Sequence, residues 1–158
     1  YDQGTMQRNF MGFTTRAGAD LVALGVSAIS SAGDMYAQNV KKLPPYRRAL
    51  EAGRFPVERG MLLTRDDSIR RDVIAAVMCR DYLDKREIEG KYNITFNDYF
   101  EDELRRLRPL VEDELLTVRE DSLELTFLGR LFARNIAMVF DAYLRKPQSR
   151  QVMYSRTL

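Results

Sequence analysis

The chain contains 158 residues, 45% of them apolar, and its 25 basic and 23 acidic residues leave a net charge of +2. This composition is typical of a folded globular protein and excludes an intrinsically disordered one. No apolar run reaches the 18 residues that a membrane-spanning helix requires, so we expect no membrane partner and a cytoplasmic location.

Two residue types are scarce, and their scarcity excludes several chemistries. The absence of histidine rules out Ser–His and Cys–His nucleophilic mechanisms and His-ligated zinc within this chain. The single cysteine, Cys79, cannot form an internal disulfide, a zinc ribbon or an iron–sulfur cluster. We therefore predict no catalytic residue and no metal ligand here, and any redox cofactor must be ligated from elsewhere. The polar start without a methionine leads us to expect a piece of a longer chain.

Charged residues alternate in sign along the chain, as in the run from Arg65 to Asp72. Nucleic-acid-binding domains usually concentrate basic residues on one face, because neutralising phosphates supplies most of their affinity. Alternating charges indicate a solvated surface instead, so we expect no nucleic-acid partner.

The first third of the chain begins with turn signals over residues 1–20. Residues 21–30 are then small and apolar without strict alternation, which favours a strand buried on both faces, as in a parallel sheet. A buried helix of this length is the alternative. Gly33 and Asp34 are expected to start a helix that runs through residues 35–40.

In the middle of the chain, the pair Pro44-Pro45 predicts the start of a helix over residues 46–52, which Gly53 ends. Residues 55–63 are expected to be extended. After this segment the sequence pattern becomes strongly helical, and we place a domain boundary near this point. The predicted domains are residues 1–55 and residues 56–158.

The second domain is predicted to be mainly helical. A helix should start with Asp67 or Ser68 as its N-cap and carry an apolar stripe at helical spacing. Two further helices, a β-hairpin and a closing helix complete the order of a winged-helix domain, which is a clue to fold rather than to function. The predicted elements are helix 84–92, a helix from residue 97 that Pro109 kinks or restarts, the hairpin of 116–119 and 123–126, helix 127–144, and an extended end with Tyr154 and Leu158.

Several blocks taken together carry a resemblance that spans the chain. They resemble the oxygen-independent coproporphyrinogen III oxidases of the radical S-adenosylmethionine family, and specifically the C-terminal part of those enzymes. The most specific blocks are Gly25-Val26-Ser27-Ala28-Ile29-Ser30 and Asp66-Asp67-Ser68-Ile69-Arg70-Arg71-Asp72-Val73-Ile74, accompanied by Arg8-Asn9-Phe10-Met11-Gly12-Phe13-Thr14-Thr15, Gly33-Asp34, Tyr36-Ala37-Gln38-Asn39, Arg59-Gly60, Gly129-Arg130-Leu131, Arg134-Asn135-Ile136 and Tyr154-Ser155-Arg156.

The resemblance implies a fold and an activity for the parent enzyme. The fold would be the end segment of an α/β radical S-adenosylmethionine barrel, incomplete here, followed by a mainly α winged-helix-like domain. The family converts coproporphyrinogen III to protoporphyrinogen IX in haem synthesis by oxidatively decarboxylating two propionates. It uses S-adenosylmethionine and a [4Fe–4S] cluster whose cysteines would lie outside this chain. The implied partners are the substrate and the N-terminal remainder of the barrel, in a monomer whose electron donor is not identified.

Ile29 is the cofactor-binding residue that the resemblance implies. Ligand sites of barrels lie at the C-terminal ends of strands, and Ile29 falls near that end of the strand predicted over residues 21–30. A plain core strand is the alternative on spacing alone. Met11 stands where relatives carry glutamine, and methionine cannot donate a hydrogen bond, so no role is carried over. Tyr36 and Gln38 either reach the barrel mouth or, for Tyr36, only pack beneath the second domain.

Arg65, Arg70 and Arg71 could bind substrate propionates, but local pairing with the neighbouring aspartates is favoured, because charge runs at helix starts are usually solvated. Cys79 is expected in the core, as isolated helical cysteines usually are. A non-catalytic winged-helix interaction module is the alternative function. Binding of DNA by that module is disfavoured, because its recognition helix would begin with acidic residues.

Overall fold

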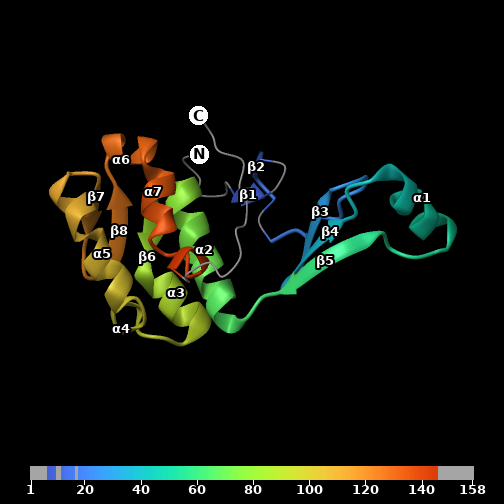
Figure 1. Ribbon diagram of the computed structural model, residues 1–158. Helices are drawn as coiled ribbons and strands as arrows, with labels where there is room; N and C mark the ends of the chain where they lie inside the picture. Colours follow the sequence, from blue (N-terminus) through green and yellow to red (C-terminus); the bar gives the residue numbers. More distant parts are fainter. Residues whose placement is uncertain (1–6, 10–11, 17, 146–158) are drawn as a thin grey trace. The chain divides into compact units, whose positions relative to one another are not determined.

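The computed structural model describes residues 7–9, 12–16 and 18–145. Its contacts divide the chain into two compact units, residues 1–80 and residues 81–158, and each unit is described by itself (Figure 1). Contact-based units need not coincide with domains, so the boundary predicted between residues 55 and 56 stays a prediction. Met11, Tyr154 and Leu158 lie outside the described residues.

The first unit is built around a three-stranded antiparallel sheet with β4 in the middle. A two-residue turn at Gly33 and Asp34 joins β3 to β4, and the register pairs Ile29 with Gln38 and Gln38 with Arg59. A separate two-stranded hairpin precedes this sheet. The strands are β1 (Gln7–Asn9), β2 (Gly12–Thr14), β3 (Ile29–Ala32), β4 (Met35–Asn39) and β5 (Val57–Leu62).

The prediction of one strand over residues 21–30 is wrong. Leu21 makes an isolated bridge to Ser31, the chain then loops, and strand β3 begins at Ile29. Gly25 and Ser27 have φ angles of 105° and 58°, outside the region of regular β-strands. The predicted burial is also wrong, since the Leu24 side chain in this loop is 86% exposed.

The helix predicted over residues 35–40 is also wrong, because this segment is strand β4. Gly33 adopts a φ of 53° and closes a tight hairpin with Asp34, the kind of turn that joins antiparallel strands. Consequently, the sheet is antiparallel, and the parallel character expected from the apolar run is not found in the described residues.

The helix after Pro44-Pro45 and the extended segment that follows are confirmed as α1 (Leu43–Glu51) and β5. Pro44 lies in the first turn of α1, where a missing N–H costs nothing. Gly53 follows the helix with a φ of 67°, the left-handed conformation common at helix ends.

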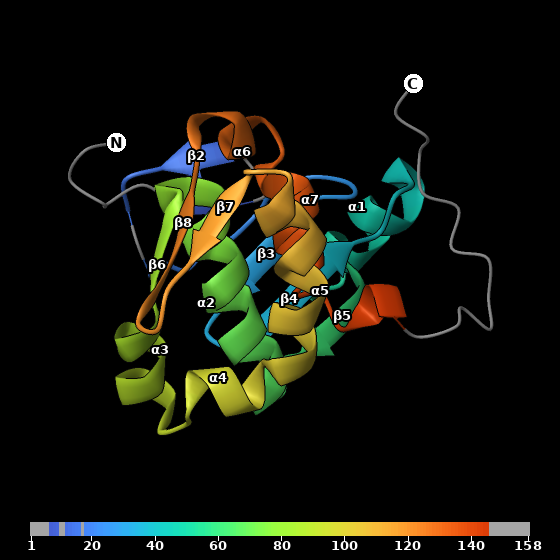
Figure 2. The same cartoon turned by 90° about the vertical axis from the view of Figure 1, so that its left-hand side faces the viewer.

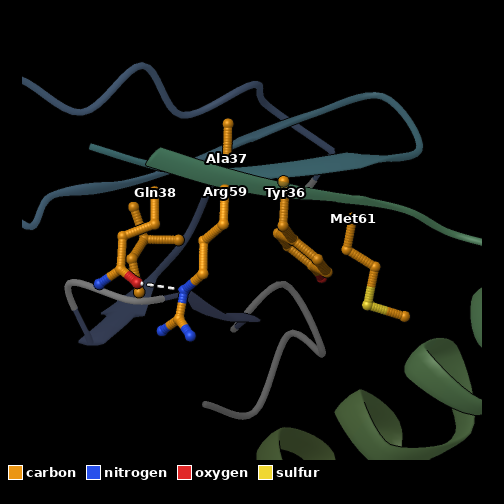
Figure 3. Close-up of a pocket in the computed structure, with 7 residues that line it drawn as sticks. Tyr36, Ala37, Gln38, Arg59 and Met61 are labelled. Atoms are coloured by element: carbon orange, nitrogen blue, oxygen red, sulfur yellow. Dashed lines mark hydrogen bonds between the residues drawn. The ribbon is translucent and has the colours of Figure 1, made fainter. Parts of the chain in front are cut away.

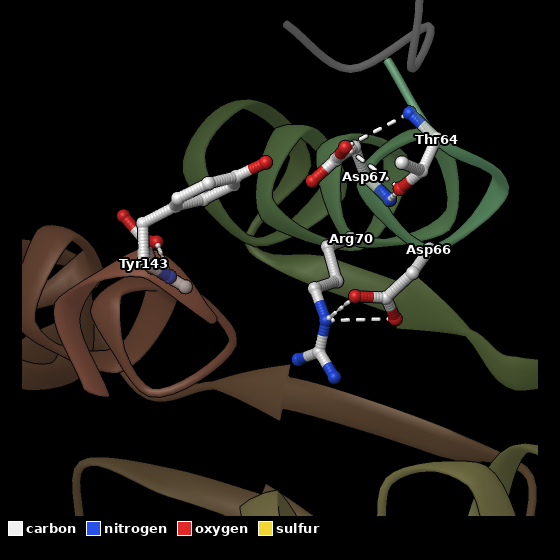
Figure 4. Close-up of polar contacts among 6 residues, drawn as sticks. Thr64, Asp66, Asp67, Arg70 and Tyr143 are labelled. Carbon is white, nitrogen blue, oxygen red and sulfur yellow. Dashed lines mark hydrogen bonds and ion pairs between the residues drawn. The ribbon is translucent and has the colours of Figure 1, made fainter. Parts of the chain in front are cut away.

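Helix α2 (Arg65–Arg80) starts earlier than predicted. Its N-cap is Thr64, whose Oγ1 accepts a hydrogen bond from the Asp67 N–H at 3.1 Å, while Asp67 Oδ2 accepts one from the Thr64 N–H at 2.8 Å (Figure 4). This reciprocal capping box explains why the prediction of Asp67 or Ser68 as the cap is wrong: Asp67 belongs to the box at its third helical position.

The turn between β3 and β4 is fastened to α2. The Leu63 N–H donates to the Asp34 carbonyl at 2.8 Å, directly before the helix. Ser68 Oγ donates to Asp34 Oδ1 at 3.4 Å, and Arg71 donates to the Gly33 carbonyl at 3.4 Å and lies 3.7 Å from Asp34 Oδ1. These contacts fix the start of the helix against the end of the sheet within the first unit.

The second unit combines a small antiparallel sheet, in the order β6-β8-β7, with short helices (Figure 2). The helix over residues 84–92 and the hairpin are confirmed. The predicted helix from residue 97 is divided at Phe100 and continues through Pro109, and the predicted closing helix is divided at Phe132. The elements are β6 (Tyr82–Asp84), α3 (Lys85–Tyr92), α4 (Phe96–Tyr99), α5 (Glu101–Glu112), β7 (Leu116–Val118), β8 (Ser122–Leu125), α6 (Phe127–Leu131), α7 (Ala133–Met138) and the 3-10 helix η1 (Tyr143–Arg145).

Three phenylalanines form the centre of this second core. Phe96, Phe100 and Phe140 are fully buried, and the ring of Phe100 lies 4.7 Å from that of Phe96 and 5.4 Å from that of Phe140. Tilted and edge-on contacts of this kind add to the free energy of apolar burial. The division of the helix at Phe100 therefore places this ring at the centre of the core.

The described part of the chain closes no barrel, since the strands of the first unit's larger sheet lie in the open order β3-β4-β5. No helix in the described ranges is long and apolar enough to cross a membrane.

Lys85 fastens the β7–β8 hairpin to α3. Its ammonium is buried and donates to Asn97 Oδ1 at 2.9 Å, to the Arg119 carbonyl at 2.5 Å and to the Glu120 carbonyl at 3.2 Å. Burial lowers the pKa of Lys85 below its ordinary value of 10.5, while the charges of Asp121, Glu89 and Glu120 oppose this shift.

Replacing Lys85→Met should lower the free energy of unfolding by about 1–3 kcal/mol at neutral pH, because three hydrogen bonds from a charged donor are lost. The stability difference between wild type and variant should widen as the pH rises toward 10.5. Between the lowered pKa of the folded protein and the ordinary pKa of 10.5, the unfolded chain binds more protons at Lys85 than the folded protein does. The stability of the wild type therefore increases with pH in this range, and the variant lacks this increase. Urea unfolding at neutral and alkaline pH measures both effects. Lys41→Met on the exposed surface is the control, and a deficit that shrinks with pH would contradict the pKa direction.

Gly129→Ala should destabilise the fold strongly, because a Cβ at Gly129 would overlap the carbonyl group of Leu115. Overpacking against backbone typically costs about 1–3 kcal/mol, and more where nothing can shift. Gly90→Ala is the matched control: Gly90 also lies in a helix, a Cβ there meets nothing within 4 Å, and helix propensity predicts a gain of roughly 0.5–1 kcal/mol. Equal effects of the two substitutions on urea unfolding would refute the close contact.

Candidate functional site

A pocket of about 210 Å³ lies on one face of the β3-β4-β5 sheet (Figure 3). In Figure 3 the side chains of Tyr36, Gln38, Arg59 and Met61 extend from the same side of the sheet, and Ala37 extends from the opposite side. The pocket is lined by Ile29, Tyr36, Ala37, Gln38, Arg59, Gly60 and Met61.

The strand register determines which side chains meet in this pocket. Ile29, Gln38 and Arg59 are direct neighbours across the three strands, and Tyr36 pairs with Met61 in a second row. Side chains two residues apart on a strand share a face, so both rows project to the same side. One row therefore supplies polar groups next to Ile29, and the other supplies an aromatic ring and a thioether.

A chain of hydrogen bonds crosses the polar row. Arg59 Nε donates to Gln38 Oε1 at 2.7 Å, and Gln38 Nε2 donates to the Ser27 carbonyl at 3.1 Å. Because the amide uses its donor on Ser27 and its acceptor on Arg59, both groups are fixed in orientation. The guanidinium is thus presented at the rim of an apolar hollow.

The loop before β3 is held by side chains from later in the sequence. The Gly25 N–H donates to the Tyr46 hydroxyl at 3.0 Å, and Asn39 Nδ2 donates to the Gly25 carbonyl at 2.9 Å. The loop also donates the Ala23 N–H to Ser30 Oγ at 3.0 Å. Asn39 is buried, and these bonds satisfy polar groups of the loop backbone that make no strand pairing.

Comparison with known proteins gives a consistent result. The family described as HemN C-terminal domain matches residues 63–132. Oxygen-independent coproporphyrinogen III oxidase from Escherichia coli is 45% identical over 99% of this chain and 34% of its own length, and the Synechocystis sp. protein of the same name is also 45% identical with the same coverage. The solved structure of the Escherichia coli enzyme HemN, described as a radical SAM enzyme, matches with a TM-score of 0.87 and 46% identity over 90% of this chain and 33% of that chain.

The chain is therefore similar to the family of oxygen-independent coproporphyrinogen III oxidases. It corresponds to the C-terminal part of that family and spans about a third of the length of the curated relatives it matches.

Ile29, the residue that resemblance to the oxidase family singles out, lies in the pocket. Ile29 is the first residue of β3, so the prediction that it lies near the C-terminal end of a strand is wrong. Tyr36 and Gln38, whose placement was left open, lie beside it. The predicted cofactor contact of Ile29 stays a prediction.

Arg59 and Met61 are site residues that the sequence reasoning missed. Both lie on β5, and their approach to Ile29 depends on pairing through β4. The Gly33-Asp34 turn could have indicated the register of β4 on β3, but no local signal fixes the register of β5 on β4, because α1 lies between these two strands in the sequence.

The remaining candidates lie outside the pocket. Arg70 Nε bonds Asp66 Oδ2 at 2.8 Å, which confirms the local pairing favoured for Arg70 (Figure 4). Arg71 lies 3.8 Å from Asp72 and 3.7 Å from Asp34, which is more distant in the sequence, so its pairing is local only in part. Cys79 is buried in α2, as expected for a core residue. Among the residues with described positions, no group of three potential ligands could hold a metal ion.

Replacing Tyr46→Phe should loosen the loop before β3 without unfolding the chain. The Gly25 N–H would lose its acceptor, a bond worth about 1 kcal/mol, so its amide proton should exchange roughly five- to tenfold faster. Hydrogen exchange followed by NMR measures this amide directly. Tyr82→Phe, at an exposed position of the second unit, is the control, and unchanged Gly25 exchange in Tyr46→Phe would contradict the proposed support.

Proposed function

We propose that this chain forms part of an enzyme that oxidatively decarboxylates two propionates of coproporphyrinogen III, giving protoporphyrinogen IX in haem biosynthesis. The similarity of 99% of the chain to proteins named for this oxidase supports the proposal. The structural observation that carries it is the pocket beside Ile29, in which apolar and fixed polar groups converge on one sheet face. The N-terminal remainder of the same polypeptide would complete the barrel around this face.

In this proposal the pocket accommodates part of S-adenosylmethionine. Ile29, Tyr36 and Met61 offer an apolar wall for a flat ring, and the Gln38 amide and Arg59 guanidinium add polar groups at its rim, so the residues present fit such a cofactor. When bound, S-adenosylmethionine supplies the oxidising radical chemistry. The contribution of this chain is to position the cofactor and to exclude water from its apolar part.

The [4Fe–4S] cluster of the proposed enzyme does not fit the residues of this chain. Cluster iron is held by several cysteine thiolates, and the sole cysteine, Cys79, is buried in helix α2. The ligands therefore belong to another part of the parent polypeptide, and no step of the reaction is assigned to this chain through the cluster.

The second unit is proposed to be a winged-helix-like domain that does not bind nucleic acid. Its order of short helices followed by the β7–β8 hairpin supports the winged-helix description. Helix α5, which would be the recognition helix, begins with the exposed residues Glu101 and Asp102, and their carboxylates would be repelled by phosphates. A cytoplasmic, monomeric parent enzyme completes the proposal.

The test uses the full-length polypeptide that contains this chain, reconstituted anaerobically. It should bind S-adenosylmethionine and release carbon dioxide from coproporphyrinogen III. Ile29→Ala should weaken S-adenosylmethionine binding by roughly five- to twelvefold, because about 1–1.5 kcal/mol of apolar contact is removed. Leu50→Ala, which truncates a half-exposed side chain of α1, should leave the affinity unchanged. A full-length protein without a CxxxCxxC cysteine triplet, or one that binds no S-adenosylmethionine, would support the interaction module instead.

A further inference from the structure

Arg59 lines the pocket and is held by a neutral amide side chain rather than by a carboxylate. Arg70, Arg71, Arg86, Arg119 and Arg130 each lie within ion-pair distance of a carboxylate. Arg59 has no such partner among the described residues, and its only hydrogen bond there joins Nε to Gln38. Its two terminal nitrogens remain available to a ligand.

The orientation of this guanidinium is fixed from behind. Gln38 holds Nε at 2.7 Å and is itself held by the Ser27 carbonyl, at the end of the loop that Asn39 and Tyr46 support. A planar guanidinium held through Nε directs its remaining N–H groups outward as a fork. Preorganisation of this kind lowers the entropic cost of binding.

The surroundings define the class of ligand. A guanidinium fork matches the geometry of a carboxylate, which it binds through two parallel hydrogen bonds. Ile29, Tyr36 and Met61 line the adjoining hollow with apolar surface, and its volume of about 210 Å³ suits one arm of a ligand rather than a whole macrocycle. The site thus combines a carboxylate receptor with an apolar wall.

We propose that Arg59, positioned by Gln38, binds the carboxylate of a small molecule whose apolar portion lies against Ile29, Tyr36 and Met61. The identity of the molecule rests on the proposed function, which offers two sources of this chemistry: the methionyl carboxylate of S-adenosylmethionine and a propionate of the tetrapyrrole. Both contain a carboxylate on a short flexible arm next to an apolar or aromatic body.

Two substitutions remove the interaction in different ways. Arg59→Gln deletes the charge, and Gln38→Glu places a competing carboxylate against Arg59 while retaining the arginine. Arg54→Gln is the matched control, because it removes one positive charge from an exposed residue near α1 that does not line the pocket. Thermal unfolding of each variant checks that the fold is retained.

Binding is measured on the anaerobically reconstituted full-length protein without reductant, so that no turnover occurs. The probes are S-adenosylmethionine and its decarboxylated analogue, and coproporphyrin III and its tetramethyl ester. Arg59→Gln and Gln38→Glu should each weaken one carboxylate-bearing probe about tenfold or more, and its carboxylate-free analogue by less than twofold. The affected pair identifies the source of the carboxylate, and Arg54→Gln should change no affinity.

Two results would overturn this assignment while leaving the proposed function standing: wild-type affinity for both carboxylate probes in Arg59→Gln, or equal weakening of a probe and its carboxylate-free analogue. Failure of the wild-type protein to bind either carboxylate probe would overturn the assignment together with the proposed function.

Discussion

The pairing of β4 with both of its neighbours is the constraint on which the candidate site depends. Strand β3 contributes one lining residue and β4 and β5 contribute three each, and none of the three strands could form the pocket alone. Because the register sets Gln38 between Ile29 and Arg59, a shift of one residue would turn the polar row to the opposite face and abolish the hydrogen-bond chain. The pocket is therefore a property of the sheet as a whole, in which the central glutamine connects the backbone of one segment to the side chain of another.

Elements with local signals could be predicted from the sequence. Helix α1 follows a proline pair and ends before a glycine, α3 begins at the cap Asp84, and the β7–β8 hairpin follows alternation. The segment from residue 21 to residue 40 could not, because its conformation depends on distant partners. Gly25 adopts its left-handed conformation with its N–H bonded to Tyr46, 21 residues later in the chain. The sequence of an apolar run does not indicate which distant residue will bond its backbone, and this run is compatible with either a strand or a helix.

The residues of the candidate site also differ in whether the sequence could predict them. Ile29 was reached through resemblance to the oxidase family, and the residues that surround it required the register of the sheet. Arg59 stands 30 residues after Ile29, in a segment whose extended character was foreseen but whose partner was not. The prediction of a local ion pair succeeded for Arg70 because Asp66 lies within one helical turn, where sequence spacing and spatial distance coincide.

The bonds that fasten the β3–β4 turn to α2 have a mechanical consequence. Only Leu63 and Thr64 separate β5 from this helix, and Leu63, Ser68 and Arg71 all bond the turn at Gly33 and Asp34. The helix is thus joined to the sheet at two points, through the chain itself and through the turn, with no flexible linker to absorb a torque. If binding of a ligand in the pocket changed the twist of the sheet, α2 would therefore rotate with it. The sheet and the helix would move as one rigid element.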